Sequence, residues 1–600
     1  MGLSLTHTLL AGQLVQLVAP AFAVWASVAV ARRLQFLGTA PVGVDALIAL
    51  IAIPAFHIGR ARWQYACFRH KAARLGATLP PLWGGKLLAN FDVIRLLDKA
   101  YREGFLSDHL YEKFDELGPT YNLYVLWDSD YCTTDAAVIK SVLATDFNNW
   151  VKGERFDTYV RSVLGTGVFN SDGRLWKFHR SMTRPFFARE RISDFETFSR
   201  HAEEAVGKMK ERLREGYAVD FADLISRFTM DAASEFLFGA CLHSVRGALP
   251  YPHDAPAHLR AGQARLPADA FADAYRAALR AISHRARLVW LWPWFELFQS
   301  RTDEPMREID RWLAPIIQKA LGVAQEAEKQ GTVGVEKQVE EDETLLDHLA
   351  KCTTDPNILH DEILNILLAG RDTTAGTLTF VIYFLSQHPD VLRRLRQEII
   401  DTVGPTNRPS YDDIKQMKYL RAVLNETMRL YPSVPWNIRY AVEDAILPNS
   451  DPSGKPWFIP AGASVSYSVH CMHRRKDYWG PDADEFDPDR FLDARLHKYL
   501  MPNPFIFLPF NAGPRICLGQ QFAYNEMSFF VVKLLQAFDD IAFVREAFDP
   551  AALPPAAWAA FPGRKGKEKV WPRAHVTVYS EGGMWVKMRE APAGQIDAEA

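Results

Sequence analysis

Hydrophobic and polar positions recur along most of the chain with the period of a helix. The clearest helical patterns cover residues 198–216, 361–386 and 390–402. Apolar side chains three to four positions apart in these segments form one face of an α-helix. Strand-like alternation is short and infrequent, and it is clearest at residues 463–470 and 576–579. The second of these segments leads through two glycines into 584–588, which predicts a hairpin. The pattern as a whole predicts a mainly α fold with minor β sheets.

The first segment of the chain has a different pattern. Residues 8–31 form a run of 24 positions without a charge, whereas a helix needs about 20 residues to cross a bilayer core. Arg32 and Arg33 follow, and residues 41–58 form a second apolar stretch that is interrupted by Asp45. A cleaved signal peptide is disfavoured, because no basic residue precedes the run and the run is too long.

Two membrane topologies follow from this pattern. A basic cluster within residues 60–74 is expected to stay cytoplasmic. If both apolar stretches span the membrane, Arg32 and Arg33 lie on the opposite side, whereas one span with an interfacial second helix avoids that conflict. Residues 79–85 combine prolines with a glycine pair, which predicts a hinge. We therefore expect an N-terminal membrane anchor and basic linker at 1–78 and a catalytic domain at 79–600.

Composition narrows the class of protein. The 600 residues carry 69 Lys and Arg against 72 Asp and Glu, and 48% of them are hydrophobic. These values exclude a disordered chain and argue against nucleic acid as the main partner. No two of the six cysteines lie within 45 positions of each other, which excludes zinc or redox CxxC motifs and a disulfide scaffold. Surface insertions are predicted at 246–270, 324–344 and 549–569.

One cysteine lies in a distinctive loop. The segment FNAGPRICLG, residues 510–519, directly precedes a helical pattern. Gly513 and Gly519 would let the backbone approach a flat ligand, and Arg515 offers a cation to a carboxylate. Cys517 precedes a helix N-terminus, which favours a thiolate. A lone cysteine is more often a buried, inert side chain, but a thiolate on such a loop is typical of a haem axial ligand.

The loop resembles the haem-binding signature FxxGxRxCxG of the cytochrome P450 superfamily. All its fixed positions are present, beginning with Phe510. The resemblance implies the cytochrome P450 fold, with haem b as cofactor and Cys517 as the ligand of its iron. It also implies that Gly513, Arg515 and Gly519 contact the cofactor.

A second motif lies within the apolar run 363–385. Two glycines, Gly370 and Gly376, weaken this helix, and they flank Asp372 and Thr373. The segment resembles the AGxDT oxygen-activation motif of the same superfamily. A helix opened here could hold water, and the resemblance implies that Asp372 and Thr373 handle the protons that oxygen activation consumes. A glycine-weakened core helix without a catalytic role is the alternative.

Further motifs follow the order of that superfamily. Glu426 and Arg429 share a helix face, and the pair resembles the ExxR motif. In the superfamily this pair forms a buried structural network with a later arginine, here Arg490. Trp176 and Arg180 resemble the WxxxR pattern whose side chains bind a haem propionate. An exposed arginine beside a packed tryptophan is the alternative for that pair.

The resemblance implies a monooxygenase that inserts one oxygen atom from O2 into a hydrophobic substrate. Arg439 is implied as a further propionate ligand. No GxGxxG pattern follows a strand, and the resemblance implies that electrons come from a separate NADPH–cytochrome P450 reductase. Its docking face is expected near Cys517, with Lys177 and Lys533. The protein is expected in the endoplasmic reticulum membrane, with its catalytic domain facing the cytosol and membrane lipid as a partner.

The substrate is less sharply defined by the sequence. The segments AGRDTTAG and FNAGPRICLGQQFA resemble the fungal membrane-bound branch that hydroxylates long-chain alkanes and fatty acids. Oxidation of aromatic or polycyclic compounds is the alternative. Family members that rearrange peroxides without a reductase typically lack the acid–threonine pair. The pocket is expected at residues 152–169, 364–373, 434–438 and 582–584, and the lid is expected within 246–270.

Overall fold

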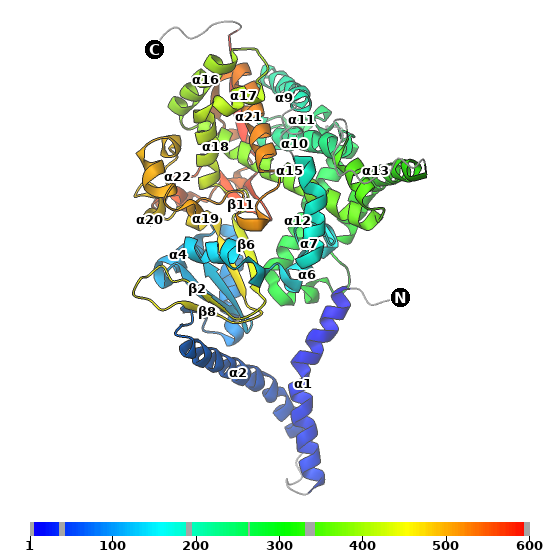
Figure 1. Ribbon diagram of the computed structural model, residues 1–600, viewed down its shortest axis with the longest axis vertical. Helices are drawn as coiled ribbons and strands as arrows, with labels where there is room; N and C mark the ends of the chain where they lie inside the picture. Colours follow the sequence, from blue (N-terminus) through cyan, green and yellow to red (C-terminus); the bar gives the residue numbers. More distant parts are fainter. Residues whose placement is uncertain (1–4, 35–41, 188–194, 262–264, 330–342, 593–600) are drawn as a thin grey trace.

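The structure is a computed structural model that describes residues 5–34, 42–187, 195–261, 265–329 and 343–592 (Figure 1). The prediction of a mainly α fold with minor sheets is confirmed. The long helices of the globular part are α9 (Glu196–Arg214), α10 (Phe221–Phe238), α12 (Pro267–Leu288), α13 (Asp303–Lys329), α15 (Pro356–Leu385), α16 (Pro389–Val403), α18 (Lys418–Leu430) and α21 (Gln520–Ala537). The shorter helices are α3 (Phe91–Glu103), α4 (Asp108–Leu117), α5 (Ala136–Lys140), α6 (Gly153–Leu164), α7 (Gly173–Thr183), α11 (Ala257–Ala261), α14 (Leu345–Cys352), α17 (Tyr411–Gln416), α19 (Val469–Met472), α20 (Lys476–Trp479) and α22 (Arg564–Lys567).

Helix α15 runs through the centre of the globular part and packs against α10, α18 and α21. Its apolar residues are buried on nearly all sides, as expected for a helix that is hydrophobic all round. Aromatic rings tie it to its neighbours: Phe380 stacks on Tyr431 at 4.1 Å and Phe384 stacks on Phe486 at 4.2 Å between ring centroids. Burial of each such side chain contributes about 1.5–3 kcal/mol to folding.

A six-stranded sheet in the order β1-β2-β3-β9-β6-β4 forms most of the β structure. Its strands are β1 (Leu82–Trp83), β2 (Thr120–Val125), β3 (Asp128–Thr133), β4 (Trp150–Val151), β6 (Trp436–Ala441) and β9 (Ser464–Ser468). The smaller sheets contain β5 (Val219–Asp220), β10 (Phe538–Phe543) and β13 (Trp585–Glu590), then β11 (Trp571–Ala574) with β12 (Val578–Glu581), and β7 (Ala445–Leu447) with β8 (Trp457–Ile459). The strand expected at 463–470 is therefore present as β9, and it ends where Ser468 caps α19.

The predicted hairpin of 576–579 with 584–588 is wrong. Strand β12 pairs with β11, whereas β13 pairs with β10 and β5. Gly582 and Gly583 have φ of +74° and +91°, a backbone conformation that favours glycine. They direct the chain out of one sheet and into another. The two glycines do form a turn, but the pairing partners of the flanking strands depend on distant segments.

Helix α15 is unbroken through Gly370 and Gly376, so the expected opening of this helix is not observed. Gly376 has a packing reason instead. A Cβ atom at this position would lie 2.7 Å from the backbone oxygen of Val578. The missing side chain therefore lets β12 approach the helix closely.

Two apolar helices, α1 (Leu5–Arg33) and α2 (Val42–Arg74), project together from one end of the molecule (Figure 1). Both are long and apolar enough to cross a membrane. Near their far ends, Arg32 forms an ion pair with Asp45. The ion pair neutralises Arg32, one of the two arginines whose charge disfavours a double span.

The linker expected to act as a hinge is attached to the globular part. Thr78 forms backbone hydrogen bonds with Pro456 and Phe458 at 2.9 and 2.8 Å. Strand β1 then pairs with β2 inside the six-stranded sheet. Ala72 and Ala77 pack against Phe458. The end of α2 is thus held by apolar packing, and the linker that follows it by main-chain hydrogen bonds to the globular part.

Two expectations about insertions also change. The described part of 246–270 lies against α9 and the C-terminal region, with hydrogen bonds from Arg212 to the Leu249 carbonyl and from the His253 amide to Ala547. Residues 549–569 include the buried Glu568, which pairs with Arg564 and accepts hydrogen bonds from two tyrosines. In the third insertion, 330–342 lie outside the described residues.

Candidate active site

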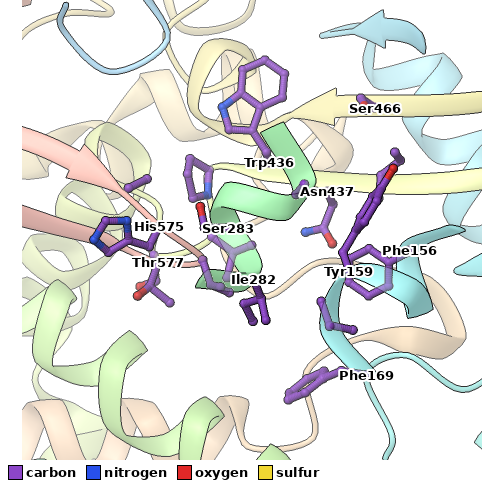
Figure 2. A pocket seen from close by; sticks show the side chains of 18 of the residues that line it. Phe156, Tyr159, Phe169, Ile282, Ser283, Trp436, Asn437, Ser466, His575 and Thr577 are labelled. Atoms are coloured by element: carbon purple, nitrogen blue, oxygen red, sulfur yellow. The ribbon is translucent and has the colours of Figure 1, made fainter. Parts of the chain in front are cut away.

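A cavity of about 1100 Å³ lies next to α15 and is lined mainly by apolar side chains. Ligand pockets in proteins usually measure roughly 300–1,000 Å³, so there is room for a large planar group and a second molecule. Figure 2 shows part of this lining, with Phe156, Tyr159, Phe169 and Ile282 around an open centre and His575 at one side. The lining side chains come from α3, α6, α7, α12, α15, β6, the loop before α21 and the turn between β11 and β12.

Cys517 lies in the lining of this cavity, three residues before α21. Its amide donates a hydrogen bond to the Phe510 carbonyl at 3.0 Å, which closes the loop between these two residues. Gly513 has φ of +69°, and a Cβ atom there would lie 1.9 Å from the Leu143 carbonyl oxygen. Only glycine satisfies both conditions. Gly519 has more space, because its Cβ would meet nothing closer than Phe187 at 3.7 Å.

The side chain of Cys517 is accessible from the cavity, and the surrounding protein disfavours the thiolate. Burial raises its pKa to about 11, although the Gly519 amide and the Arg180 guanidinium act in the opposite direction. The expected effect of the helix N-terminus is therefore weaker than the effect of burial. A metal ion bound to the sulfur would supply the missing stabilisation of the charge, because a coordinating thiol is deprotonated.

Trp176 and two arginines form a layer beside Cys517. The guanidinium of Arg515 lies 4.6 Å from the Trp176 ring centroid and that of Arg180 lies 5.7 Å from it. Arg180 donates a hydrogen bond to the Ile516 carbonyl at 2.9 Å. Arg515 pairs with Asp172 at 2.6 Å, and its Nε is buried without a hydrogen-bond partner. No sequence motif identifies Asp172, because a lone aspartate before a helix has no distinctive spacing.

The same wall of the cavity carries unbalanced positive charge. Arg439 is almost completely buried and donates to the Ile438 carbonyl at 2.8 Å. Burial, followed by repulsion from Arg439, lowers the pKa of Arg515 to about 10. Burial and the same two arginines hold the pKa of Lys152 well below its usual value. A group with two carboxylates would relieve this repulsion, so these residues fit the two propionates of haem.

Asp372 and Thr373 lie side by side on α15. The Thr373 hydroxyl donates to the Ala369 carbonyl at 2.6 Å and lines the cavity. Asp372 is not among the lining residues of the cavity and accepts a hydrogen bond from Arg371 at 2.9 Å. Burial raises the pKa of Asp372, whereas Arg371 and Arg276 oppose the shift. Ser433 donates to the Thr373 carbonyl at 3.1 Å and holds the neighbouring segment against the helix.

Glu426, Arg429 and Arg490 form a completely buried network. Arg429 donates to both carboxylate oxygens of Glu426, at 2.7 and 2.8 Å. Arg490 approaches the same carboxylate at 3.5 Å and also pairs with Asp482 at 2.9 Å. Arg429 donates further hydrogen bonds to the carbonyls of His473, Ala483 and Glu485. The network joins α18 to the chain that leads toward the Cys517 loop, and none of its three members lines the cavity.

Comparison with known proteins gives the family. The model of the cytochrome P450 family matches residues 93–542. The chain belongs to the cytochrome P450 family. Its relatives include cytochrome P450 52A13 of Debaryomyces hansenii, which is 35% identical over 76% of this chain and 84% of the relative. They also include cytochrome P450 52-M1 of Starmerella bombicola, 38% identical over 68% and 75%, and cytochrome P450 monooxygenase pvhE of Talaromyces variabilis, 35% identical over 68% and 74%.

As a cytochrome P450, the protein is an oxidoreductase that uses haem with a cysteine thiolate as the iron ligand. It is a haem-thiolate monooxygenase, and the predicted resemblance is confirmed. The apolar cavity described above therefore lies in a cytochrome P450 and contains the cysteine of its signature loop.

Three of the four expected pocket segments of this cytochrome P450 line the cavity. Residues of 152–169, 364–373 and 434–438 contribute to the lining, whereas 582–584 do not. Strand β11 and the turn that leads to β12 line the cavity instead, with residues 572–577. Residues 582–584 connect β12 to β13 and do not reach this lining.

The expected lid of this cytochrome P450 was also misplaced. None of the described residues of 246–270 lines the cavity, but residues 282–284, 286–289 and Phe295 do. These belong to the end of α12 and to η6 (Val289–Glu296), a 3₁₀ segment between α12 and α13. The buried Arg285 holds this segment through both oxygens of Glu296, at 3.0 and 2.6 Å. Helix α1 also contacts it, where Gln13 donates to the Trp290 carbonyl at 2.6 Å.

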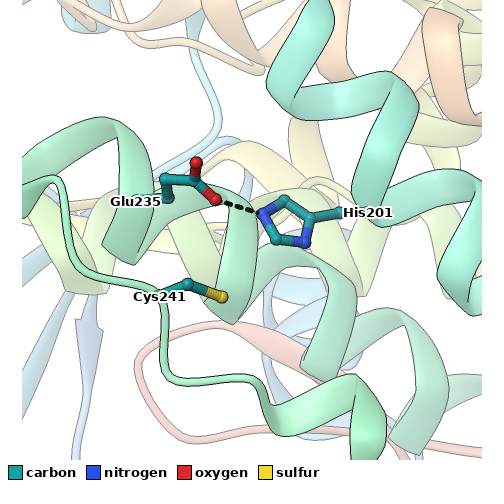
Figure 3. A group of neighbouring side chains, drawn as sticks. All are labelled: His201, Glu235 and Cys241. Carbon is teal, nitrogen blue, oxygen red and sulfur yellow. Dashed lines mark hydrogen bonds and ion pairs between the residues drawn. The ribbon is translucent and has the colours of Figure 1, made fainter.

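Apart from the Cys517 loop, one group of described residues has the composition of a metal site. His201, Glu235 and Cys241 place their ligand atoms within 4.8 Å of one another (Figure 3). Glu235 is already paired with His201 at 2.7 Å and with Arg200 at 2.5 Å. Burial raises the pKa of Cys241 to about 11, so its thiol is neutral. The contacts of Glu235 therefore explain the cluster as ion pairs beside a neutral thiol.

Proposed function

We propose that this cytochrome P450 hydroxylates long-chain alkanes or fatty acids, with haem b held by Cys517. The observation that carries the proposal is that the cysteine of the signature loop lines a large, mainly apolar cavity next to α15. The similarity to cytochromes P450 52 of several yeasts supports the same substrate class, because the sequence motifs resemble that branch. When bound, haem would supply the iron chemistry that activates O2 and transfers one oxygen atom to the substrate.

The residues around the cofactor would fix its orientation. Cys517 would bind the iron from one side, and Trp176, Arg180, Arg439 and Arg515 would bind the propionates. Their positive charge is balanced by Asp172 alone among the contacts described above, which supports this role. Gly513 would keep the loop narrow, and Phe510, which packs on Tyr524 at 5.0 Å, would support the loop beside Cys517.

Asp372 and Thr373 would manage protons. The Thr373 hydroxyl donates a hydrogen bond to the Ala369 carbonyl. Its oxygen can therefore accept a hydrogen bond from a group in the cavity. Asp372 has a raised pKa and a salt-bridge partner, Arg371, and it lies on the side of the helix away from the cavity lining. A carboxyl group in this position can take protons from the solvent side. Apolar lining residues would exclude bulk water from the reacting atoms.

The electron donor would be NADPH–cytochrome P450 reductase. A second hollow of about 820 Å³ lies beside the Cys517 loop and is lined by Arg180 and Arg184. Arg184 and Lys177 are exposed, which supports a basic docking face for an acidic partner. Lys533 fits this role less well, because its ammonium group lies 3.9 Å from Glu203 and its side chain is only 16% exposed.

The site of action would be the endoplasmic reticulum membrane, with the catalytic domain in the cytosol. Residues 1–78 would serve as anchor and linker, and 79–600 would form the haem domain. Two features support a hairpin of two spans: α1 and α2 project together, and Asp45 neutralises Arg32. Trp294, Phe295 and Phe298 are exposed on the segment that α1 contacts, which supports immersion of the cavity mouth in the membrane surface.

The test is turnover by the purified enzyme with reductase, NADPH and O2. Dodecane, dodecanoic acid and a polycyclic aromatic compound are offered in parallel. Oxidised product from the linear substrates, formed with consumption of NADPH, is the expected result. Preferred oxidation of the aromatic compound would favour the alternative substrate class. Conversion of a lipid hydroperoxide without reductase would identify a peroxide-rearranging enzyme instead.

A further inference from the structure

The mouth of the cavity contains a cluster of cations that nearby anions balance only in part. Arg287, near the end of α12, lies over the ring of Tyr101 at 3.5 Å, and Arg573 of β11 lies 5.2 Å from the same ring centroid. All three residues line the cavity and are partly exposed. Arg280, which is exposed, donates a hydrogen bond to His575 at 3.2 Å. Arginines from two separate elements thus converge where the cavity meets the surface.

One of these arginines has no anionic partner. Arg287 makes no hydrogen bond or ion pair with any residue that the structure describes, and its Nη1 atom is buried. Arg573 is partly balanced, since its Nε lies 3.6 Å from Glu581. Its Nη1 and Nη2 atoms each donate one hydrogen bond to the carbonyls of Arg102 and Tyr101, at 3.3 and 3.0 Å, and each nitrogen retains a second proton for a ligand. Asp98 also lines this mouth but is paired with Arg102 at 2.6 Å. A buried guanidinium nitrogen without an acceptor is unfavourable, so the site is suited to an anion from outside the chain.

The hydrogen bonds around His575 leave the Tyr101 hydroxyl available as a further donor. Nε2 of His575 accepts a hydrogen bond from Arg280, so in the neutral ring Nδ1 carries the proton. That proton can be donated to the Tyr101 hydroxyl oxygen, which lies 3.0 Å away. Burial, together with Arg280, Arg287 and Arg573, lowers the pKa of His575 to about 4, in agreement with a neutral ring. The Tyr101 O–H is then free to donate to a ligand.

We propose that Arg287, Arg573 and Tyr101 bind the carboxylate of a long-chain fatty acid at the cavity mouth. The inference rests on the proposed function and makes it more specific, because an alkane has no group for these donors. A guanidinium and a hydroxyl match the geometry of a carboxylate. The inner lining offers the alkyl chain an apolar path, including Ile282, Leu288, Val434, Leu368 and Val576. The far end of the chain then points toward Cys517.

The experiment compares two probes of equal chain length with the detergent-solubilised holoenzyme. Dissociation constants for dodecanoate and dodecan-1-ol are measured by calorimetry in wild type and Arg287→Gln. The expected result is that dodecanoate binds about tenfold to a hundredfold more weakly to the variant, while dodecan-1-ol changes less than about twofold. Arg311→Gln on α13, where the exposed arginine pairs with Glu308, is the matched control and should leave both constants unchanged.

A second variant separates loss of the anchor from loss of the fold. Tyr101→Phe removes only the free hydroxyl and should weaken dodecanoate binding by about twofold to tenfold. In both variants the fraction of dodecanoate oxidised at its terminal carbon should fall, since the chain is no longer held at its other end. Unchanged dodecanoate affinity in both variants would overturn the proposal, as would an equal loss for dodecan-1-ol.

Failure of the proposed function would look different. In that case wild-type enzyme would oxidise neither dodecanoate nor dodecan-1-ol, whatever the affinities of the variants. Oxidation of both compounds by wild type with no effect of Arg287→Gln or Tyr101→Phe would leave the monooxygenase function intact and reject the carboxylate site alone.

Discussion

The inner end of the cavity, around Cys517, and its mouth, around Tyr101 and Arg287, are assembled in different ways. At the inner end, one loop of ten residues and two helices supply the main groups, and close contacts such as that of Gly513 with Leu143 fix the backbone. At the mouth, the lining side chains come from three distant elements: α3, the end of α12, and β11 with the turn that follows it.

This difference has a physical reason. A planar cofactor demands fixed positions for a sulfur atom and for several cations, which local spacing in the sequence can provide. A flexible apolar substrate demands mainly space, and many combinations of distant segments can provide it. We therefore expect substitutions at the inner end to be severe and substitutions at the mouth to change selectivity while the fold is kept.

The largest effect is expected from Arg429→Ala. Its guanidinium is buried with Glu426 and binds three backbone carbonyls, and breaking a buried pair destabilises a protein by about 3–5 kcal/mol. Arg394→Ala is the control, because Arg394 forms an exposed pair with Asp489 that is worth about 0–1 kcal/mol. Urea unfolding of both variants measures the difference. Similar losses of stability in the two variants would show that the network does not support the inner end.

A loss of catalytic coupling is expected from Thr373→Ala. Without the hydroxyl, the cavity loses the oxygen that we assign to accept a hydrogen bond during proton delivery, and a positioned group in proton transfer contributes about 100-fold or more. Product formed per NADPH consumed should therefore fall roughly a hundredfold, with hydrogen peroxide as the side product. Thr379 on the same helix bonds to the Ala375 carbonyl in the same way, at 2.8 Å, but does not line the cavity. Equal coupling in Thr373→Ala and Thr379→Ala would make the first hydroxyl structural.

The two glycines of the Cys517 loop should differ in their tolerance of alanine. Gly513→Ala combines a left-handed backbone with a Cβ 1.9 Å from the Leu143 carbonyl oxygen, and the backbone conformation alone is unfavourable by about 1–2 kcal/mol. Gly519→Ala meets only Phe187 at 3.7 Å. Thermal unfolding should show a clear loss for the first variant and a small change for the second. The reverse order would show that the loop is held by other contacts.

The smallest effect on the haem domain is expected from removal of the N-terminal anchor. Truncations that remove residues 1–62 or 1–78 should both lower membrane association and retain haem. The longer truncation also removes Ala72 and Ala77, which pack on Phe458, and should reduce stability by about 1–2 kcal/mol. Sedimentation with membranes and urea unfolding test the two parts. Loss of haem from the shorter truncation would show that α1 and α2 support the inner end.

The same division explains which features the sequence could predict. Cys517 and Gly513 lie in one short motif, and Glu426 and Arg429 lie one helical turn apart, so short local segments carry the family resemblance that identifies them. The mainly α fold followed from long apolar periods, which buried helices such as α15 require. In contrast, residues 572–577 carry no motif. Their place depends on the pairing of β12 with β11 and on a hydrogen bond from the Val578 amide to the Ser433 carbonyl, both of which join distant parts of the chain.

The central claim is that Cys517 is the thiolate ligand of the haem iron. It is tested most directly by the difference spectrum of the reduced enzyme with carbon monoxide, measured for wild type, Cys517→Ser and Cys241→Ser. Cys241 is a half-buried cysteine outside the cavity lining and serves as the control. We predict the absorption typical of thiolate-ligated haem in wild type and in Cys241→Ser, and its complete loss in Cys517→Ser. An unchanged spectrum in Cys517→Ser would contradict the account.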